Sequence, residues 1–197
     1  VGFDVRALHE AKFSLEELAA GSFSAVELKS VGFNDARALK AVGFSLSSLK
    51  EAGFAIDDLK AAGFDAAAFK SCAYDASILR TCGFSCEALK AAGFSAAELG
   101  AAGFSITVLK AACFDARTLH AAGHNLQTLA AAGFDAVSLK VCGFDARALK
   151  DVGFDAACLK AAAFNAASLV EAGFSAADLK AAGFDPGALR AAGFDLS

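Results

Sequence analysis

Large apolar side chains recur along the chain at every tenth position, with polar residues in fixed places between them. An aromatic residue stands at 3, 13, 23 and 33, then at 44, 54 and so on to 194, and eighteen of these twenty positions are Phe. Tyr74 and His124 fill the other two, and Leu follows five residues after most of them, with Phe69 as the one replacement. A constant period of this kind indicates a tandem repeat, here with the consensus Ala-Ala-Gly-Phe-(Ser/Asp)-Ala-x-x-Leu-Lys.

The polar residue after each aromatic position predicts the start of a short α-helix. It is Ser, Asp or Asn in every unit except the one with Ala55. These side chains accept hydrogen bonds from the free N–H groups of a first helical turn. Ser95 is therefore predicted to cap a helix over 96–101. Pro186 follows Asp185 at a first helical position, where its missing N–H costs nothing.

The glycine that usually stands before the aromatic position predicts the end of the preceding helix. Gly103 suits the left-handed conformation that reverses the chain after a helix. Leu99 would then contact Phe94 through a hydrophobic staple and Phe104 through the apolar contact of a Schellman motif. Each Leu is predicted to lie between two aromatic rings, which accounts for the strict spacing.

Six-residue helices do not persist alone, because isolated helices shorter than about 12–15 residues are marginal in water. Stability must come from stacked neighbours. The prediction is an all-α solenoid of about twenty very short α-helices, one per repeat, forming a single tandem array over residues 1–197. One repeat, 33–43, has eleven residues, and we expect a bulge or a shifted cap there with the stack continuing. The pattern leaves open whether two, three or four helices complete one coil.

The chain begins and ends inside a repeat unit, so we expect it to be a fragment of a longer array.

Within each unit, the first helical residue and the residue before Gly are apolar and are predicted to be buried. Large members of the first-residue column are Val5, Leu15, Leu46, Ile56, Ile106, Leu126 and Leu196. Large members of the column before Gly are Val42, Cys72, Cys82, Cys142 and Val152.

The residue after Leu is basic in most units and is predicted to lie outside, in the last turn, where a cation suits the helix dipole. The second helical residue is often charged, as in Arg117 and Arg147, and is predicted to face solvent. The basic column is a candidate surface ladder that could present cations to an anionic polymer, but a solvated face that also favours the helix ends is the preferred explanation, because acidic residues are interspersed and the net charge is negative. Its members are Lys29, Lys40, Lys50, Lys60, Lys70, Arg80, Lys90, Lys110, Lys140, Lys150, Lys160, Lys180 and Arg190.

Composition and charge exclude several other roles. The chain has 18 basic and 22 acidic residues, so its net charge of −4 gives no case for nucleic-acid binding. No apolar stretch approaches the roughly 18 residues that a membrane span needs. The alternation of Asp with Ser after the aromatic positions points to capping, because the two exchange as caps but not as general acids. We predict no catalytic residues and no cofactor.

The His and Cys residues read as substitutions within the repeat. His9 and His120 stand in the basic column, and Gly123 would interrupt the helix that His120 and His124 need in order to share a metal ion, so no metal site is predicted. Free Cys behaves as a small apolar residue. Cys72 and Cys82 occupy equivalent places in adjacent units, and a disulfide between them is left open.

The run Ala-Ala-Gly-Phe-Ser-Ala-Ala-Glu-Leu resembles decapeptide repeats found in long proteins of protists, algae and other microbes, and the resemblance covers the whole chain. It implies repetition and modularity only. We expect a structural role, as a scaffold, a spacer or a filament-forming segment. The alternatives are an interaction solenoid that presents a groove or the basic column to a partner, and a non-catalytic region of a larger enzyme. Expected partners are further copies of the chain, associating end to end or laterally, or another protein.

Overall fold

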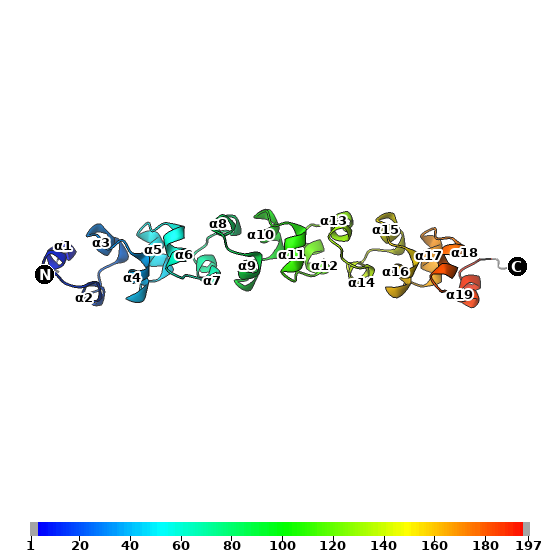
Figure 1. The fold of residues 1–197 in the computed structure, drawn as a ribbon, viewed down its shortest axis with the longest axis horizontal. Helices are drawn as coiled ribbons and strands as arrows, with labels where there is room; N and C mark the ends of the chain where they lie inside the picture. The colour runs from blue at the N-terminus through cyan, green and yellow to red at the C-terminus, as the bar shows by residue number, and fades with distance from the viewer. Residues whose placement is uncertain (1–3, 195–197) are drawn as a thin grey trace. The chain divides into compact units, whose positions relative to one another are not determined.

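The computed structural model describes residues 4–194, and it is built of short α-helices joined by tight turns (Figure 1). These residues form nineteen helices of six residues each and no strand, which confirms the predicted all-α repeat solenoid. Phe3 and Leu196 lie outside the described residues. The helices are α1 Val5–Glu10, α2 Leu15–Ala20, α3 Ala25–Ser30, α4 Ala36–Ala41, α5 Leu46–Glu51, α6 Ile56–Ala61, α7 Ala66–Ser71, α8 Ala76–Thr81, α9 Cys86–Ala91, α10 Ala96–Ala101, α11 Ile106–Ala111, α12 Ala116–Ala121, α13 Leu126–Ala131, α14 Ala136–Val141, α15 Ala146–Asp151, α16 Ala156–Ala161, α17 Ala166–Glu171, α18 Ala176–Ala181 and α19 Pro186–Ala191.

The helices begin where the capping pattern places them. Ser95 accepts a hydrogen bond from the Glu98 backbone N–H at 3.2 Å, and the Glu98 side chain accepts one from the Ser95 N–H at 2.7 Å, forming the capping box. Asp185 caps α19 with Pro186 at its first position. Ala55 precedes α6 without any side-chain cap. Side-chain capping therefore sets the first residue of every described helix but one.

The helices end in the predicted Schellman motif. Gly103 has φ +88°, its N–H donates to the Gly100 carbonyl at 2.9 Å, and the Phe104 N–H donates to the Leu99 carbonyl at 3.1 Å. Both bonds satisfy carbonyls that the short helix leaves free. Ala163 stands at the glycine position of its own turn and adopts φ +60°, a conformation that strains a residue with a Cβ.

Two compact units divide the chain, Val1–Phe94 with α1 to α9 and Ser95–Ser197 with α10 to α19. Within each unit, helices two apart in the chain stack on one another. In the N-terminal unit α3 stacks on α5, α4 on α6 and α7 on α9. In the C-terminal unit the same relation links α12, α14, α16 and α18, and also α15, α17 and α19.

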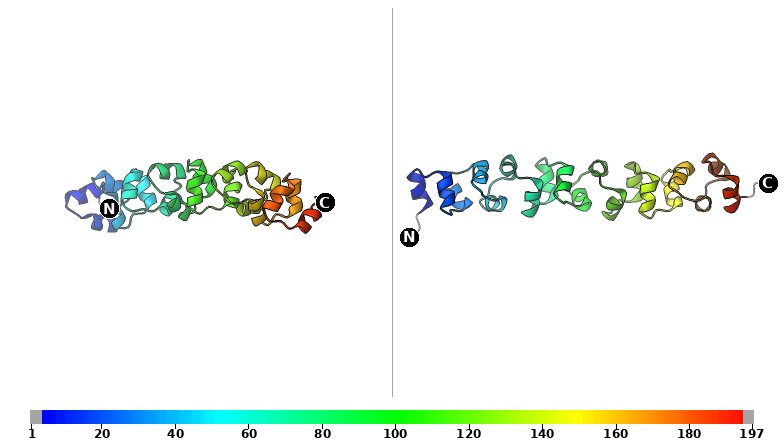
Figure 2. Two further views of the ribbon diagram at one scale, coloured as in Figure 1. Left: turned by 45° about the vertical axis from the view of Figure 1, so that its right-hand side comes forward. Right: turned by 90° about the horizontal axis from the view of Figure 1, so that it is seen from below.

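Stacking between alternate helices settles the coil that the sequence left open. About two helices, or twenty residues, complete one level of each unit. In Figure 1, α1 and α3 lie along one side of the N-terminal unit and α2 and α4 along the other, and α13 and α15 face α14 and α16 in the same way in the C-terminal unit. Figure 2 shows the same succession of helices from two further directions.

The central Leu column forms the core. Leu99, Leu109 and Leu139 are fully buried, and burial of a Leu side chain contributes about 2 kcal/mol before entropy is subtracted. The aromatic column is less deeply buried than the Leu column, since Phe94 is buried but Phe104 is only half-buried. Leucine side chains rather than rings therefore fill the centre of each level.

The two small-residue columns are only partly as predicted. Where the first helical residue is Ala it is mostly buried. Of the larger residues in this column, Val5 and Leu46 are buried as predicted, whereas Leu15, Ile56, Ile106 and Leu126 are half-buried. The residues before Gly are also mixed: Ala102 is buried and Ala92 is half-buried, and the larger members are all half-buried, namely Val42, Cys72, Cys82, Cys142 and Val152. Burial in these two columns therefore varies from level to level and does not follow the size of the side chain.

The eleven-residue repeat shifts a cap and leaves the stack intact. Asp35, not Asn34, caps α4, and its side chain accepts from the Arg37 N–H at 2.8 Å. Because α3 still stacks on α5 and α4 on α6, the additional residue is absorbed in the turn between helices, which confirms the expected shifted cap.

Candidate functional site

The basic column points back into the protein, toward the end of the helix two places further along the chain. Lys110, in α11, donates from Nζ to the Ala132 carbonyl at 3.0 Å and to the Gly133 carbonyl at 2.7 Å, just after α13. The same Nζ lies 4.8 Å from the centre of the Phe134 ring. We call this arrangement, with a lysine, one or two turn carbonyls and a ring, a lysine bridge.

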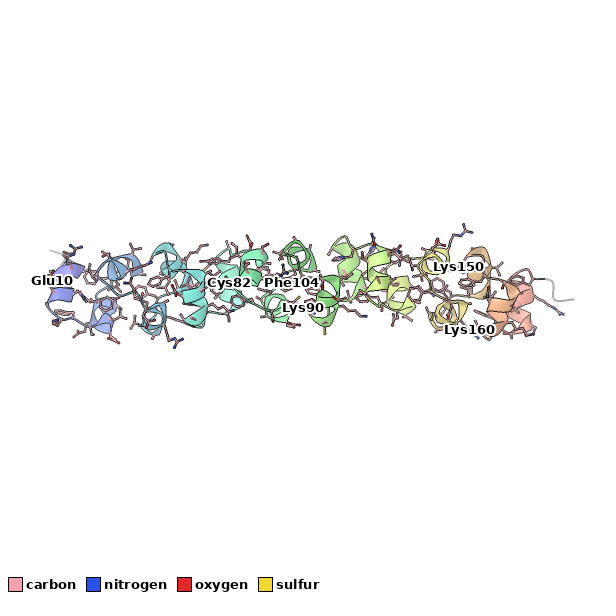
Figure 3. The ribbon with its side chains drawn as sticks, turned by 45° about the horizontal axis from the view of Figure 1, so that its top comes forward. Glu10, Cys82, Lys90, Phe104, Lys150 and Lys160 are labelled. Atoms are coloured by element: carbon pink, nitrogen blue, oxygen red, sulfur yellow. The ribbon has the colours of Figure 1, made fainter. Side chains whose placement is uncertain are left out.

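Nine lysine bridges recur among the described residues, with Nζ 4.3–4.9 Å from the ring centre. Figure 3 labels Lys150 on one side of the C-terminal unit and Lys160 on the other, as expected if bridges from successive helices form two series. The pairs are Lys29–Phe54, Lys40–Phe64, Lys50–Tyr74, Lys60–Phe84 and Lys70–Phe94 in the N-terminal unit, and Lys110–Phe134, Lys140–Phe164, Lys150–Phe174 and Lys160–Phe184 in the C-terminal unit.

The lysine bridge joins two favourable interactions of a cation. The carbonyls after a helix carry partial negative charge and lack partners within the helix, so an ammonium group with three donors satisfies them. The face of an aromatic ring also attracts a cation. Each bridging lysine therefore stabilises the end of a helix other than its own, and most of these lysines are half-buried, although Lys50 is exposed.

The other residues of the basic column differ in their exposure. Lys90 is half-buried, and Arg80, Lys180 and Arg190 are exposed. His9 and His120, which stand in the same column, place their own rings against the corresponding aromatic residues: the ring centres are 5.1 Å apart for His9 and Phe33 and 4.8 Å apart for His120 and Phe144. Imidazole thus takes the place of the ammonium group at these two levels.

Arginines in the second helical column make a second link between stacked helices that the sequence reasoning missed. These side chains are exposed, as predicted, yet the guanidinium of Arg37 donates to the Ala61 carbonyl at 2.9 Å and that of Arg147 to the Glu171 carbonyl at 2.6 Å. In both cases the acceptor is the last residue of the helix two places on. No signal in the sequence could have found them, because the separation of 24 residues between donor and acceptor is set by the stacking of alternate helices.

Small hollows lie where the start of one helix meets the end of the next one in its stack. One of about 310 Å³ is lined by residues that include Asp145, Arg147 and Glu171, and one of about 340 Å³ by residues that include Asp35 and Arg37. Because the same repeat positions line both, the hollows are a product of stacking and mark no specialised level.

Cysteine and histidine form no metal centre in the described part of the chain. Gly123 adopts φ +97° between His120 and His124, and residues 4–194 contain no group of three or more His, Cys, Asp or Glu side chains placed to hold a metal ion. Cys72 and Cys82 are free thiols. Burial raises the pKa of the Cys82 thiol above its ordinary value, which favours the unreactive protonated form.

The repeat that organises these contacts identifies the family. The sequence matches the family described as "Decapeptide repeat region" over residues 2–76, 73–146 and 143–197. The chain belongs to this family. Comparison with curated proteins and with solved structures gives no match. In this decapeptide repeat protein, the ten-residue unit is one capped helix and its turn, and at many levels the lysine bridge links a unit to the second one after it.

Proposed function

We propose that this decapeptide repeat protein acts as a structural spacer without catalytic activity of its own, as a scaffold or as a segment of a filament. The observation that carries the proposal is the lysine bridge. The same cation, carbonyl and ring meet at nine levels, so the same geometry recurs along both units. A repeated contact of this kind suits a part whose role is to set a distance.

The use of the basic column supports a spacer over a ladder for anionic polymers. A phosphate or sulfate would have to take Lys110 and its counterparts away from two carbonyls and a ring. Mobile, hydrated lysines bind anions without that loss. The described helices also include none long and apolar enough to cross a membrane.

Small-angle X-ray scattering tests the spacer. The maximum dimension of the chain would be compared with that of a duplicate, a protein in which two copies of the chain are joined so that the ten-residue period continues across the junction. The spacer proposal expects the dimension of the duplicate to approach twice that of the single chain. A duplicate that gains little length would overturn it. Electron microscopy of the same samples would then show whether copies associate end to end or laterally, as the filament form of the proposal requires.

An exposed apolar pair favours a second candidate, an interaction module. Val137 and Val141 lie one turn apart on α14 and are 51% and 55% exposed. They line a hollow of about 420 Å³ beside Arg117. A double substitution of Val137 and Val141 to Ser, with Val26→Ser as an equally exposed control, tests this candidate. Loss of an identified partner in the double variant alone would support it.

A further inference from the structure

The lysine column is interrupted by alanine at two levels where the rest of the bridge is retained. Ala19 stands where a lysine would face Phe44, and Ala130 where a lysine would face Phe154. The separation of 24 residues between Ala130 and Phe154 is that of Lys110 and Phe134 in an actual bridge. Both alanines and both rings are half-buried.

The space that an ammonium group fills elsewhere is open at these two levels. A Cβ built on Gly133 would lie 3.3 Å from Nζ of Lys110, and one built on Gly173 would lie 3.2 Å from Nζ of Lys150. The same construction on Gly43 or Gly153 meets no atom within 4 Å. The approach to these glycines is therefore free where the bridging lysine is replaced by alanine.

The acceptors of the missing lysine also remain. In the bridges, Nζ donates to the carbonyl of the glycine or to that of the residue before it. At the Ala130 level the equivalent carbonyls are those of Val152 and Gly153, and no side chain in the described part of the chain donates to either. Two carbonyl oxygens and a ring face thus converge on one accessible place.

Other interruptions of the column do not offer the same site. At the Gly100 level the ring is His124, whose Nε2 lies 3.8 Å from a Cβ built on Gly100, so the imidazole occupies part of the space. His120 fills its level with its own ring against Phe144. Val170 carries a branched side chain at the corresponding place. Ala19 and Ala130 alone combine a short side chain with a phenyl ring.

We propose that the Ala19 and Ala130 levels are binding sites for a primary alkylammonium group. Its three N–H donors would reach the two turn carbonyls, its charge would lie over the ring of Phe44 or Phe154, and its alkyl chain would pass over the alanine methyl group. A small amine and a lysine side chain of another protein share this chemistry. The inference does not depend on the spacer proposal, since it concerns a local site on a single level.

The test is an NMR titration of the full chain with butylammonium chloride at constant ionic strength. Saturable shifts are expected for the amide signals of Gly43 and Phe44 and for those of Gly153 and Phe154. The variant Ala130→Lys supplies the consensus residue and should fill its own level. It should lose the response at Gly153 and Phe154 and keep that at Gly43 and Phe44.

A second variant tests the same logic in the opposite direction. Lys140→Ala removes a bridging lysine and should create a new saturable response at Ala163 and Phe164, because Lys140 in the native chain donates to the Ala162 and Ala163 carbonyls and lies over the Phe164 ring. Tetramethylammonium carries charge without N–H donors and should give weaker responses at every site. Responses that do not saturate, that persist in Ala130→Lys, or that sodium chloride reproduces would overturn the proposal.

A capped lysine, Nα-acetyl-lysine methylamide, distinguishes the two sources of the ammonium group. A response at the same four amides with the capped lysine indicates that a protein side chain fits the site. A response to butylammonium alone indicates that only a free amine does. Absence of both would refute the site.

Discussion

The ammonium group of Lys110 lies over the ring of Phe134, 24 positions further along the chain and two helices away, with its Nζ 4.8 Å from the ring centre. The same group donates to the carbonyls of Ala132 and Gly133. A lysine that appears from its own helix to be a favourable last-turn cation thus satisfies the end of another helix. At these levels the lysine therefore adds to the backbone hydrogen bonds that already close the end of the helix.

Removal of the ammonium group should loosen the turn that it caps. Lys110→Met keeps much of the alkyl chain and removes the charge. We expect hydrogen exchange to show about 1–2 kcal/mol less protection of the Gly133 and Phe134 amides, because the charged hydrogen bonds and the cation–π contact are lost. Lys180→Met is the control, because Lys180 is an exposed last-turn lysine, whereas Lys110 is half-buried. An equal effect of both substitutions would show that the dipole of the lysine's own helix is what matters.

Leucine truncation should be costly and position-specific. Leu139 is fully buried, so Leu139→Ala is expected to lower the free energy of unfolding by about 2–5 kcal/mol through lost burial and the cavity left behind. Val137 lies on the same helix and is 51% exposed, and Val137→Ala should change stability by about 0.5 kcal/mol or less. Urea unfolding of the two variants measures the contrast, and similar losses would contradict the placement of the core.

Glycine substitution should separate backbone strain from the approach of a lysine. Gly143 and Gly173 both have positive φ, but a Cβ on Gly143 meets nothing within 4 Å whereas one on Gly173 lies 3.2 Å from Nζ of Lys150. Gly143→Ala should cost about 1 kcal/mol through the backbone alone, and Gly173→Ala should cost more because it also displaces the bridge. Urea unfolding midpoints give the comparison; a larger loss for Gly143→Ala would contradict it.

Supplying the missing cap should stabilise the chain. Ala55 is the only N-cap residue of the described helices without a side-chain hydrogen bond, and Ala55→Ser should raise the free energy of unfolding by about 0.5–1 kcal/mol. The reverse change, Ser85→Ala, removes a cap that accepts from the Ala88 N–H at 3.2 Å and should lower it by a similar amount. Thermal unfolding of both variants tests the pair, and a neutral Ala55→Ser would count against capping as the role of this column.

The capping carboxylates should make stability depend on acid. Hydrogen bonds from the hydroxyl and the backbone N–H of Ser138 hold the pKa of Asp135 below its ordinary value of 3.8. A depressed folded-state pKa adds stability above the unfolded-state pKa, and that stability is lost as the pH falls through the folded-state pKa. Asp135→Ser keeps a cap that does not titrate. The stability difference between native chain and variant should therefore shrink on acidification, and a difference independent of pH would refute this linkage.

Local chemistry made the helices predictable, whereas stacking depended on the folded chain. Ser95, Gly103 and Leu99 act within one unit, through hydrogen bonds that span three to five residues, so the caps, the turns and the buried leucine column follow from the ten-residue pattern. The pattern is the same in every unit and thus contains no information about which units meet. Only the tertiary structure places Lys110 against Phe134 and the guanidinium of Arg147 against Glu171, because stacking of alternate helices, with about two helices to each level, brings residues 24 positions apart within reach of one another.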